Sequence, residues 1–280
     1  CAHQRSGFRP DPPGERHVLV FVRRGAFVRR TRGREVLNDA TTGYLVPPGE
    51  PEEFAHPVDG GDACTAITLS AEFLAELSGG DPALDLPDVP VDAASDRAIR
   101  RVTRLAAQDD PAEALVLAVA GVLARRVPER VASGRPATGA ARQRLVRRAR
   151  EILHAEPRTG VIDLARRAGC SPHHLSRAFS QVTGSGVSRY RNRIRVAEAV
   201  ERIGAGETAL AALAADLGFA DQAHLTRTVR ALTGSPPGAW RLPARGRCGS
   251  DPDPFPDGCG SDPVPFRGGY GGDPGREPWL

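Results

Sequence analysis

Residues 164–191 read LARRAGCSPHHLSRAFSQVTGSGVSRYR, and residues 213–241 read LAADLGFADQAHLTRTVRALTGSPPGAWR. The two stretches align once a single extra residue is allowed in the second, and equivalent positions lie about 50 residues apart. This internal repeat predicts one small helical unit used twice. The paired positions include Leu164 with Leu213, Gly169 with Gly218, Leu175 with Leu225, Arg177 with Arg227, and Gly184 with Gly234.

Each copy carries the local signals of a short helix, a glycine turn and a second helix. Gly169 and Gly218 stand where a left-handed residue ends the first helix. Ser171 and Asp221 are residue types that cap the start of the next helix, and Pro172 suits its first position. The predicted first helices are 162–168 and 210–217.

The second helix of each copy has one apolar and one polar face. Apolar residues recur at helical spacing, which predicts that this face is buried. The polar face is then free to enter a major groove, as in a helix-turn-helix motif. The residues predicted to be buried are Leu175, Phe179, Val182, Leu225, Val229 and Leu232. The residues predicted to face DNA are His173, Ser176, Arg177 and Ser180 in the first copy, and Gln222, Ala223, Thr226, Arg227 and Arg230 in the second.

The first turn also raises the question of a metal site, because Cys170 precedes His173 and His174. Thiolate and imidazole are ligands that zinc prefers, but zinc needs two more ligands and the nearby sequence offers none. Cys170 is equivalent to Phe219, and a buried free cysteine behaves as a small apolar residue. The sequence therefore predicts no metal here, and His173 is expected to face the groove.

Positive charge is concentrated in the same region. Residues 139–243 hold 17 arginines against 8 acidic residues, net +9, whereas the whole chain carries only +4. A strongly basic domain is typical of a protein that binds a polyanion.

Residues 141–243 resemble the DNA-binding domain of the AraC/XylS family of bacterial transcription regulators. The resemblance is carried by LARRAGCSPHHLSRAFSQVTG, by YRNRIRVAEA at 190–199, and by the second copy of the repeat. It implies two helix-turn-helix units separated by one long helix, here 188–203, with recognition helices in successive major grooves. In one departure, Leu225 and Val229 stand where the family usually has phenylalanine, which predicts a looser second core.

The side chains on the polar faces suggest how bases would be read. Arg177 suits guanine and Gln222 suits adenine, while Ser176 and Thr226 suit either base. We expect Arg177→Ala to weaken specific binding and to leave the thermal transition nearly unchanged. The candidate phosphate contacts are Arg191, Arg193 and Arg195, although these arginines could equally form a solvated helix face.

The N-terminal half reads as short strands. The β-branched runs HVLVFV, AFVRRT, REVLND and CTAITLS lie between residues 17 and 70, separated by glycine and proline turns. Together with the PPGEP turn at 47–51, they resemble the cupin-like sensor domain that many family members carry. Metal-binding cupins use an H-x-H pair, a glutamate and a later histidine, but here the strands offer only His17 and His56, with glutamates at 50, 52 and 53.

The predicted fold class is α+β with two domains and a disordered C-terminal tail. The predicted segments are a cupin-like β-rich sensor domain at 1–92, a helical dimerisation or connector segment at 93–131 with helices near 94–107 and 111–127, a linker at 132–140, an all-α DNA-binding domain at 141–243, and a disordered Pro/Gly-rich tail at 244–280.

The predicted function is a sequence-specific, effector-responsive transcription regulator, by analogy an activator and a homodimer. Double-stranded DNA is the expected partner, with RNA polymerase and an unidentified small molecule as further partners, and no enzyme activity, cofactor or metal is expected. The alternatives are a co-regulator that has lost DNA binding and a cupin-type metalloenzyme. No apolar run is long enough for a membrane helix and no signal peptide is visible, so a cytoplasmic protein is expected.

Overall fold

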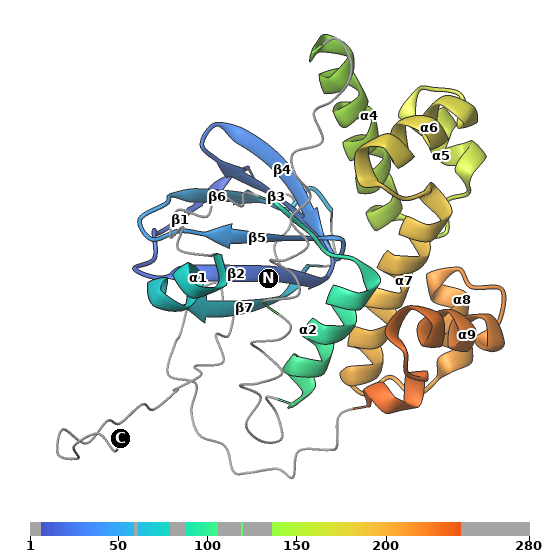
Figure 1. Ribbon diagram of the computed structural model, residues 1–280. Coiled ribbons are helices and arrows are strands. Elements are labelled where there is room, and N and C mark those ends of the chain that lie inside the picture. The colour runs from blue at the N-terminus through green and yellow to red at the C-terminus, as the bar shows by residue number, and fades with distance from the viewer. Residues whose placement is uncertain (1–6, 59–60, 79–87, 106–118, 120–135, 242–280) are drawn as a thin grey trace.

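The computed structural model describes residues 7–58, 61–78, 88–105, 119 and 136–241. Two antiparallel sheets form the N-terminal part, and a helical domain lies beside them (Figure 1). The predicted α+β class is confirmed for these residues. The predicted tail at 244–280 lies outside them.

Each sheet of the N-terminal domain has four strands, in the orders β1-β6-β3-β4 and β7-β2-β5-β8. The four predicted strand runs correspond to β2, β3, β4 and β7, whereas the short strands β1, β5, β6 and β8 were not predicted. Gly43 in β5 has a packing reason, because a Cβ there would lie 2.8 Å from the ring of Phe21. The strands are β1 (Arg9–Asp11), β2 (His17–Arg24), β3 (Ala26–Thr31), β4 (Arg34–Asp39), β5 (Thr42–Val46), β6 (Glu52–Ala55), β7 (Ala63–Leu69) and β8 (Val89–Pro90).

The helices α1 (Ala71–Ser78) and α2 (Ala93–Leu105) complete the core of this domain. Leu19 and Phe21 of β2 are in one buried cluster with Leu74 of α1 and Ile99 of α2. Of the second helix predicted at 111–127, only Val119 is described, and it is buried in the same cluster. The helix α2 also lies against the helical domain, between β2 and the helices α7 and α9 in Figure 1.

Two separate hydrophobic cores lie along the long helix α7 of the C-terminal domain. Tyr190 and Ile194 belong to the first core, and Val196 and Val200 belong to the second. The helix α4 begins inside the segment predicted as a linker. The helices are α4 (Pro136–Ala155), α5 (Val161–Ala168), α6 (Pro172–Thr183), α7 (Val187–Gly204), α8 (Leu210–Leu217) and α9 (Gln222–Thr233), followed by the 3₁₀ turn η1 (Pro237–Trp240).

The second core is as closed as the first. Leu225 and Val229 are both 0% exposed, and Phe219 and Trp240 pack in the same cluster. The expected looser second core is therefore not observed, because aromatic rings from outside α9 fill the space. The prediction that Val182 is buried is wrong, since it is 40% exposed.

Candidate DNA-binding surface

The helix α6 is built by the signals that the sequence carries. Gly169 ends α5 in the left-handed region, with φ of 79°. The Ser171 hydroxyl then accepts a hydrogen bond from the backbone N–H of His174, and Pro172 occupies the first turn. Leu175, Ala178 and Phe179 face the core below, so the opposite side of the helix faces outward.

The helix α9 is built in the same way from different residues. Gly218 is left-handed, with φ of 75°, and the Asp221 carboxylate accepts a hydrogen bond of 2.6 Å from the N–H of His224. Leu225 and Val229 take the places of Leu175 and Phe179 in the core. The sequence repeat is therefore a structural repeat, with both recognition helices starting and packing alike.

The ends of the two helices also match. Thr183 donates a hydrogen bond of 2.9 Å to the carbonyl of Phe179, and Thr233 donates one of 2.8 Å to the carbonyl of Val229. Gly184 and Gly234 then end the helices in the left-handed region. Each recognition helix is thus held at both ends, which fixes the direction of its outward face.

The structure exposes nearly all of the residues predicted to face DNA. His173, Ser176, Arg177 and Ser180 are exposed on α6, while Gln222, Ala223, Arg227 and Arg230 are exposed and Thr226 is half-buried on α9. Within the described residues, no hydrogen bond or ion pair holds the guanidinium of Arg177, Arg227 or Arg230 against the protein. Three arginines on these two helices are therefore available to an external anion.

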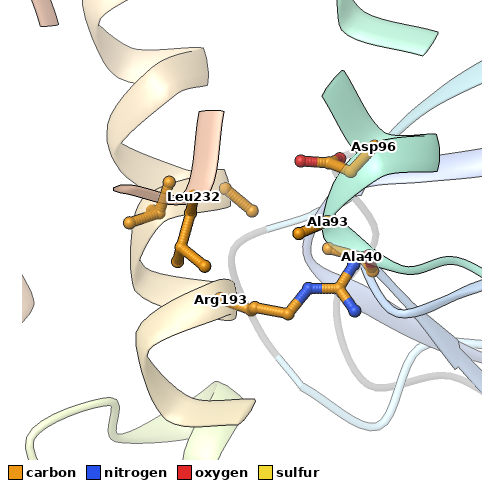
Figure 2. Close-up of a pocket in the computed structure, with 7 residues that line it drawn as sticks. Ala40, Ala93, Asp96, Arg193 and Leu232 are labelled. Atoms are coloured by element: carbon orange, nitrogen blue, oxygen red, sulfur yellow. Dashed lines mark hydrogen bonds between the residues drawn. The ribbon is translucent and has the colours of Figure 1, made fainter. Parts of the chain in front are cut away.

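The three candidate phosphate contacts on α7 are placed differently, because each donates to the protein's own backbone. Arg191 donates to the carbonyl of Thr159 at 3.0 Å. Arg193 donates to the carbonyls of Val91 and Ala40 at 2.6 and 2.8 Å, and Arg195 is 5% exposed. Figure 2 shows Arg193 reaching from α7 toward Ala40 in a small crevice between the two domains. Arg193 therefore connects α7 to the N-terminal domain, and Arg195 connects it to other parts of the helical domain.

A buried carboxylate that sequence reasoning missed joins the two domains. Asp39, at the end of β4, is 0% exposed, and its Oδ2 atom accepts hydrogen bonds from Arg150 and His154 of α4 and from Tyr190 of α7. Its other oxygen, Oδ1, accepts from the N–H and hydroxyl of Thr41 at 2.8 and 2.7 Å. In sequence, Asn38-Asp39 looks only like a turn former, and no local pattern indicates the partners about 110 to 150 residues away.

The surroundings of Asp39 keep it ionised. Burial alone would raise its pKa, but the Arg150 guanidinium and His154 hold the pKa of this carboxyl well below its usual value. Burial and the Asp39 charge raise the pKa of Tyr190, so its hydroxyl remains a donor. The domain contact therefore contains a charged pair at neutral pH.

A second set of contacts joins the N-terminal domain to the other half of the helical domain. Arg100 of α2 donates to Glu201 of α7 at 3.1 Å, and Arg97 donates to the carbonyl of Leu232 at 3.2 Å. Arg24 of β2 lies 3.4 Å from Glu198. The N-terminal domain thus contacts both helix-turn-helix units, while the outward faces of α6 and α9 remain exposed.

The described residues contain no group of three or more His, Cys, Asp and Glu side chains that could hold a metal ion. His17 and His56, the histidines considered for a cupin site, do not meet such a group, and His56 instead pairs with Asp62 at 3.0 Å. Asp62 also accepts a hydrogen bond from Cys64 at 3.4 Å, and burial raises the pKa of that thiol. Cys170 is half-buried and packs against the first helical core.

The geometry of the two helices defines a class of domain. Two capped, equally built recognition helices, joined by one long helix and bearing exposed arginines, form a tandem helix-turn-helix arrangement. Residues 164–242 match the family model described as "Helix-turn-helix domain". The match identifies this part of the chain as a helix-turn-helix domain, as the sequence predicted.

Three solved structures are similar to parts of this chain, at low identity and low TM-score. A transcriptional regulator from Chromobacterium violaceum with an AraC-type DNA-binding domain is 23% identical, covers 36% of this chain and 93% of its own, and has a TM-score of 0.34. The DNA-binding domain of AdpA in complex with a target DNA is 26% identical, with coverages of 35% and 88% and a TM-score of 0.32. ToxT from Vibrio cholerae is 11% identical, with coverages of 84% and 94% and a TM-score of 0.33.

TM-scores this low do not establish a common fold, so the assignment of residues 164–242 rests on the family-model match. A comparison with curated proteins finds no match. Among the described helices, none combines the length and the apolar character that a membrane span requires.

Proposed function

We propose that this protein regulates transcription by binding one face of a specific duplex with both recognition helices. The supporting observation is that α6 and α9 are equivalent in capping, packing and exposure, and that both present arginines without a partner among the described residues. Recognition helices of this kind enter the major groove and contact base edges through their N-terminal residues.

The proposed contact set consists of the exposed faces of the two helices. Arg177 pairs with guanine through two hydrogen bonds and Gln222 pairs with adenine, each adding about 1–3 kcal/mol of discrimination. The flexible ends of Arg227 and Arg230 supply phosphate contacts. The proposed set is His173, Ser176, Arg177, Ser180, Gln222, Ala223, Thr226, Arg227 and Arg230. It leaves out Arg193 and Arg195, which donate to backbone carbonyls, and Arg191, which donates to the Thr159 carbonyl.

The proposal includes a sensor role for the N-terminal domain, an activating effect, a homodimer formed through 93–131, and RNA polymerase as a further partner. The support for the sensor role is one buried ion pair in the β domain, whose other buried residues are mostly apolar. Arg29 is 1% exposed and pairs with Glu52 at 2.7 Å, and its guanidinium lies 4.0 Å from the centre of the Tyr44 ring. A buried charged pair of this kind suits a small polar effector.

The alternatives lack a supporting observation. A co-regulator that had lost DNA binding was suggested by the substituted second core, but that core is closed around Leu225 and Val229. A metalloenzyme requires a ligand cluster, and the described residues contain none.

The test is selection of a duplex from a random-sequence library by the full chain, followed by fluorescence anisotropy at two salt concentrations. We expect one enriched motif with two half-sites in successive major grooves, and an affinity that falls steeply with salt. Arg177→Ala should weaken binding to the selected duplex by about 10-fold or more, since one bidentate contact is worth about 1–3 kcal/mol. Arg16→Ala, an equal charge change at an exposed N-terminal residue, is the control. Failure to enrich any sequence would refute the proposal.

A further inference from the structure

One buried arginine of the long helix connects the two helix-turn-helix units. Arg195 donates to the carbonyl of Pro157 through Nε at 2.9 Å and Nη2 at 2.5 Å, and to the carbonyl of Gly218 through Nη1 at 2.8 Å. Pro157 lies in the turn that precedes α5 of the first unit. Gly218 ends α8 of the second unit and begins the turn that leads to α9. A single planar guanidinium therefore joins the backbones of both units.

A second arginine crosses the same junction in the opposite direction. Arg158 extends from the turn of the first unit, and its Nε donates to the carbonyl of Asp216 at 3.0 Å. Its Nη2 atom donates to the carbonyl of Ala215. These carbonyls lie at the C-terminal end of α8, where a positive charge is favourable, and the Ala215 carbonyl also accepts from the N–H of Gly218 at 3.1 Å.

The turn of the second unit is fitted closely to these two side chains. A Cβ at Gly218 would lie 2.7 Å from Cγ of Arg158 and 2.9 Å from Nη2 of Arg195. The equivalent Gly169 of the first unit has nothing within 4 Å of such a Cβ. The close fit is therefore a property of the junction and not of the glycine turn in general.

The arginines are held at this junction against their mutual repulsion. Burial, together with the nearby charges of Arg191 and Arg158, lowers the pKa of Arg195 to about 10. Its three nitrogen atoms donate to backbone carbonyls rather than pointing to solvent. A side chain with this arrangement is not available to a DNA phosphate.

The two hydrophobic cores do not by themselves fix how the units face each other. They form separate clusters of buried residues, and α7 contributes different side chains to each. A helix can bend or twist slightly between two such cores. A set of hydrogen bonds from one unit to the other, off the axis of α7, resists that movement.

We propose that Arg195, assisted by Arg158, is a positioning residue for DNA binding, which sets the spacing and angle between α6 and α9. The inference rests on the proposed function, because it assigns a role in binding two half-sites at once. The major-groove faces of adjacent half-sites lie about one helical turn, roughly 34–36 Å, apart, so recognition by both helices depends on a fixed separation. Neither arginine touches DNA in this proposal.

The experiment compares Arg195→Ala and Arg158→Ala with Arg202→Ala, all in the full chain. Arg202 is the matched control, because among the described residues the side chain of this α7 arginine pairs only within the second unit, with Glu207 at 3.4 Å and Asp216 at 3.2 Å. The probes are the duplex selected by the wild-type chain, two duplexes with one half-site scrambled, and two with the spacing changed by about one base pair.

For Arg195→Ala we expect the affinity for the two-half-site duplex to fall by about 10-fold or more. A rigid link between two binding elements gives the second element a high effective concentration at its half-site, and a looser link lowers that concentration. Binding to each single-half-site duplex should be unchanged. The preference for the selected spacing over the altered spacings should shrink for both Arg195→Ala and Arg158→Ala, and should persist for Arg202→Ala.

A direct phosphate contact would give a different result. Affinity would then fall equally on all five duplexes, and the slope of log affinity against log salt would decrease by about 0.9. That result, or wild-type affinity and spacing preference in Arg195→Ala, overturns the positioning role while leaving the proposed function intact. Circular dichroism checks folding, and if Arg195→Ala does not fold, the exposed Arg158→Ala carries the test by the same spacing criterion. If the wild-type chain selects no duplex, the proposed function fails and the positioning role fails with it.

Discussion

The domain contact at Asp39 gives the sharpest prediction for stability. In Asp39→Asn the shape of the side chain is kept, but the charge that faces Arg150 is lost. Asp39 is 0% exposed and the Arg150 side chain is 12% exposed, so the variant leaves a nearly buried guanidinium without its carboxylate. Removing one partner of a buried pair costs about 3–5 kcal/mol. The amide oxygen can still accept a hydrogen bond from Tyr190, which places the expected loss near the lower end, at about 3 kcal/mol.

The assay is thermal unfolding of the full chain followed by circular dichroism and calorimetry. For a domain of this size, about 1 kcal/mol shifts the midpoint by about 2–4 °C, so Asp39→Asn should lower it by about 6–12 °C. The control is Glu35→Gln, which removes another contact between the domains, the pair of Glu35 with Arg147 at 3.0 Å. Both side chains of that pair are 35% exposed, and exposed pairs are worth at most about 1 kcal/mol. If Asp39→Asn loses no more stability than Glu35→Gln, the Asp39 cluster does not hold the domains together and the reasoning is refuted.

Three further predictions follow from single features of the fold. The difference in unfolding free energy between wild type and Asp39→Asn should be constant from about pH 5 to 7 and should shrink below about pH 4. The reason is that a carboxyl whose pKa is lowered in the folded state stabilises the protein above its unfolded-state pKa, and loses that contribution as the pH falls through its folded-state pKa. The measurement is the thermal midpoint of both proteins over an acid titration. Gly218→Ala should lower the free energy of unfolding by more than Gly169→Ala. Alanine in the left-handed conformation costs about 1 kcal/mol at either position, but only Gly218 also lacks space for a Cβ. Equal losses in urea unfolding would contradict the close fit at the junction. Ser171→Ala should cost about 1 kcal/mol by removing the N-cap of α6, whereas Ser171→Asp should retain the cap, and unchanged stability in the alanine variant would show that the hydrogen bond to His174 contributes nothing.

Local signals in the sequence were sufficient for the recognition helices. Glycine at the left-handed positions, serine or aspartate at the caps, and apolar residues at helical spacing act within a few residues of one another, so they can be read in order along the chain. Their limit appears at Val182, which has the right spacing but lies at the last turn of α6, where the core has already ended and the side chain is 40% exposed. The short strands β5 and β6 were missed because Gly43 and a four-residue span give little alternation to read.

The roles of the arginines show what the sequence alone did not determine. The same residue type stands on helical segments of one basic domain at Arg177, Arg193 and Arg195. Net charge does not distinguish these three arginines. Their surroundings in the fold differ. The turn at Pro157 and the end of α8 surround Arg195, whereas Arg193 donates to the carbonyls of Ala40 and Val91. Arg177 is exposed and has no partner among the described residues. The repeat itself determined that two helix-turn-helix units form. Only the tertiary structure decided which charges remain available to DNA and which connect the units and domains, since those partners come from distant parts of the chain.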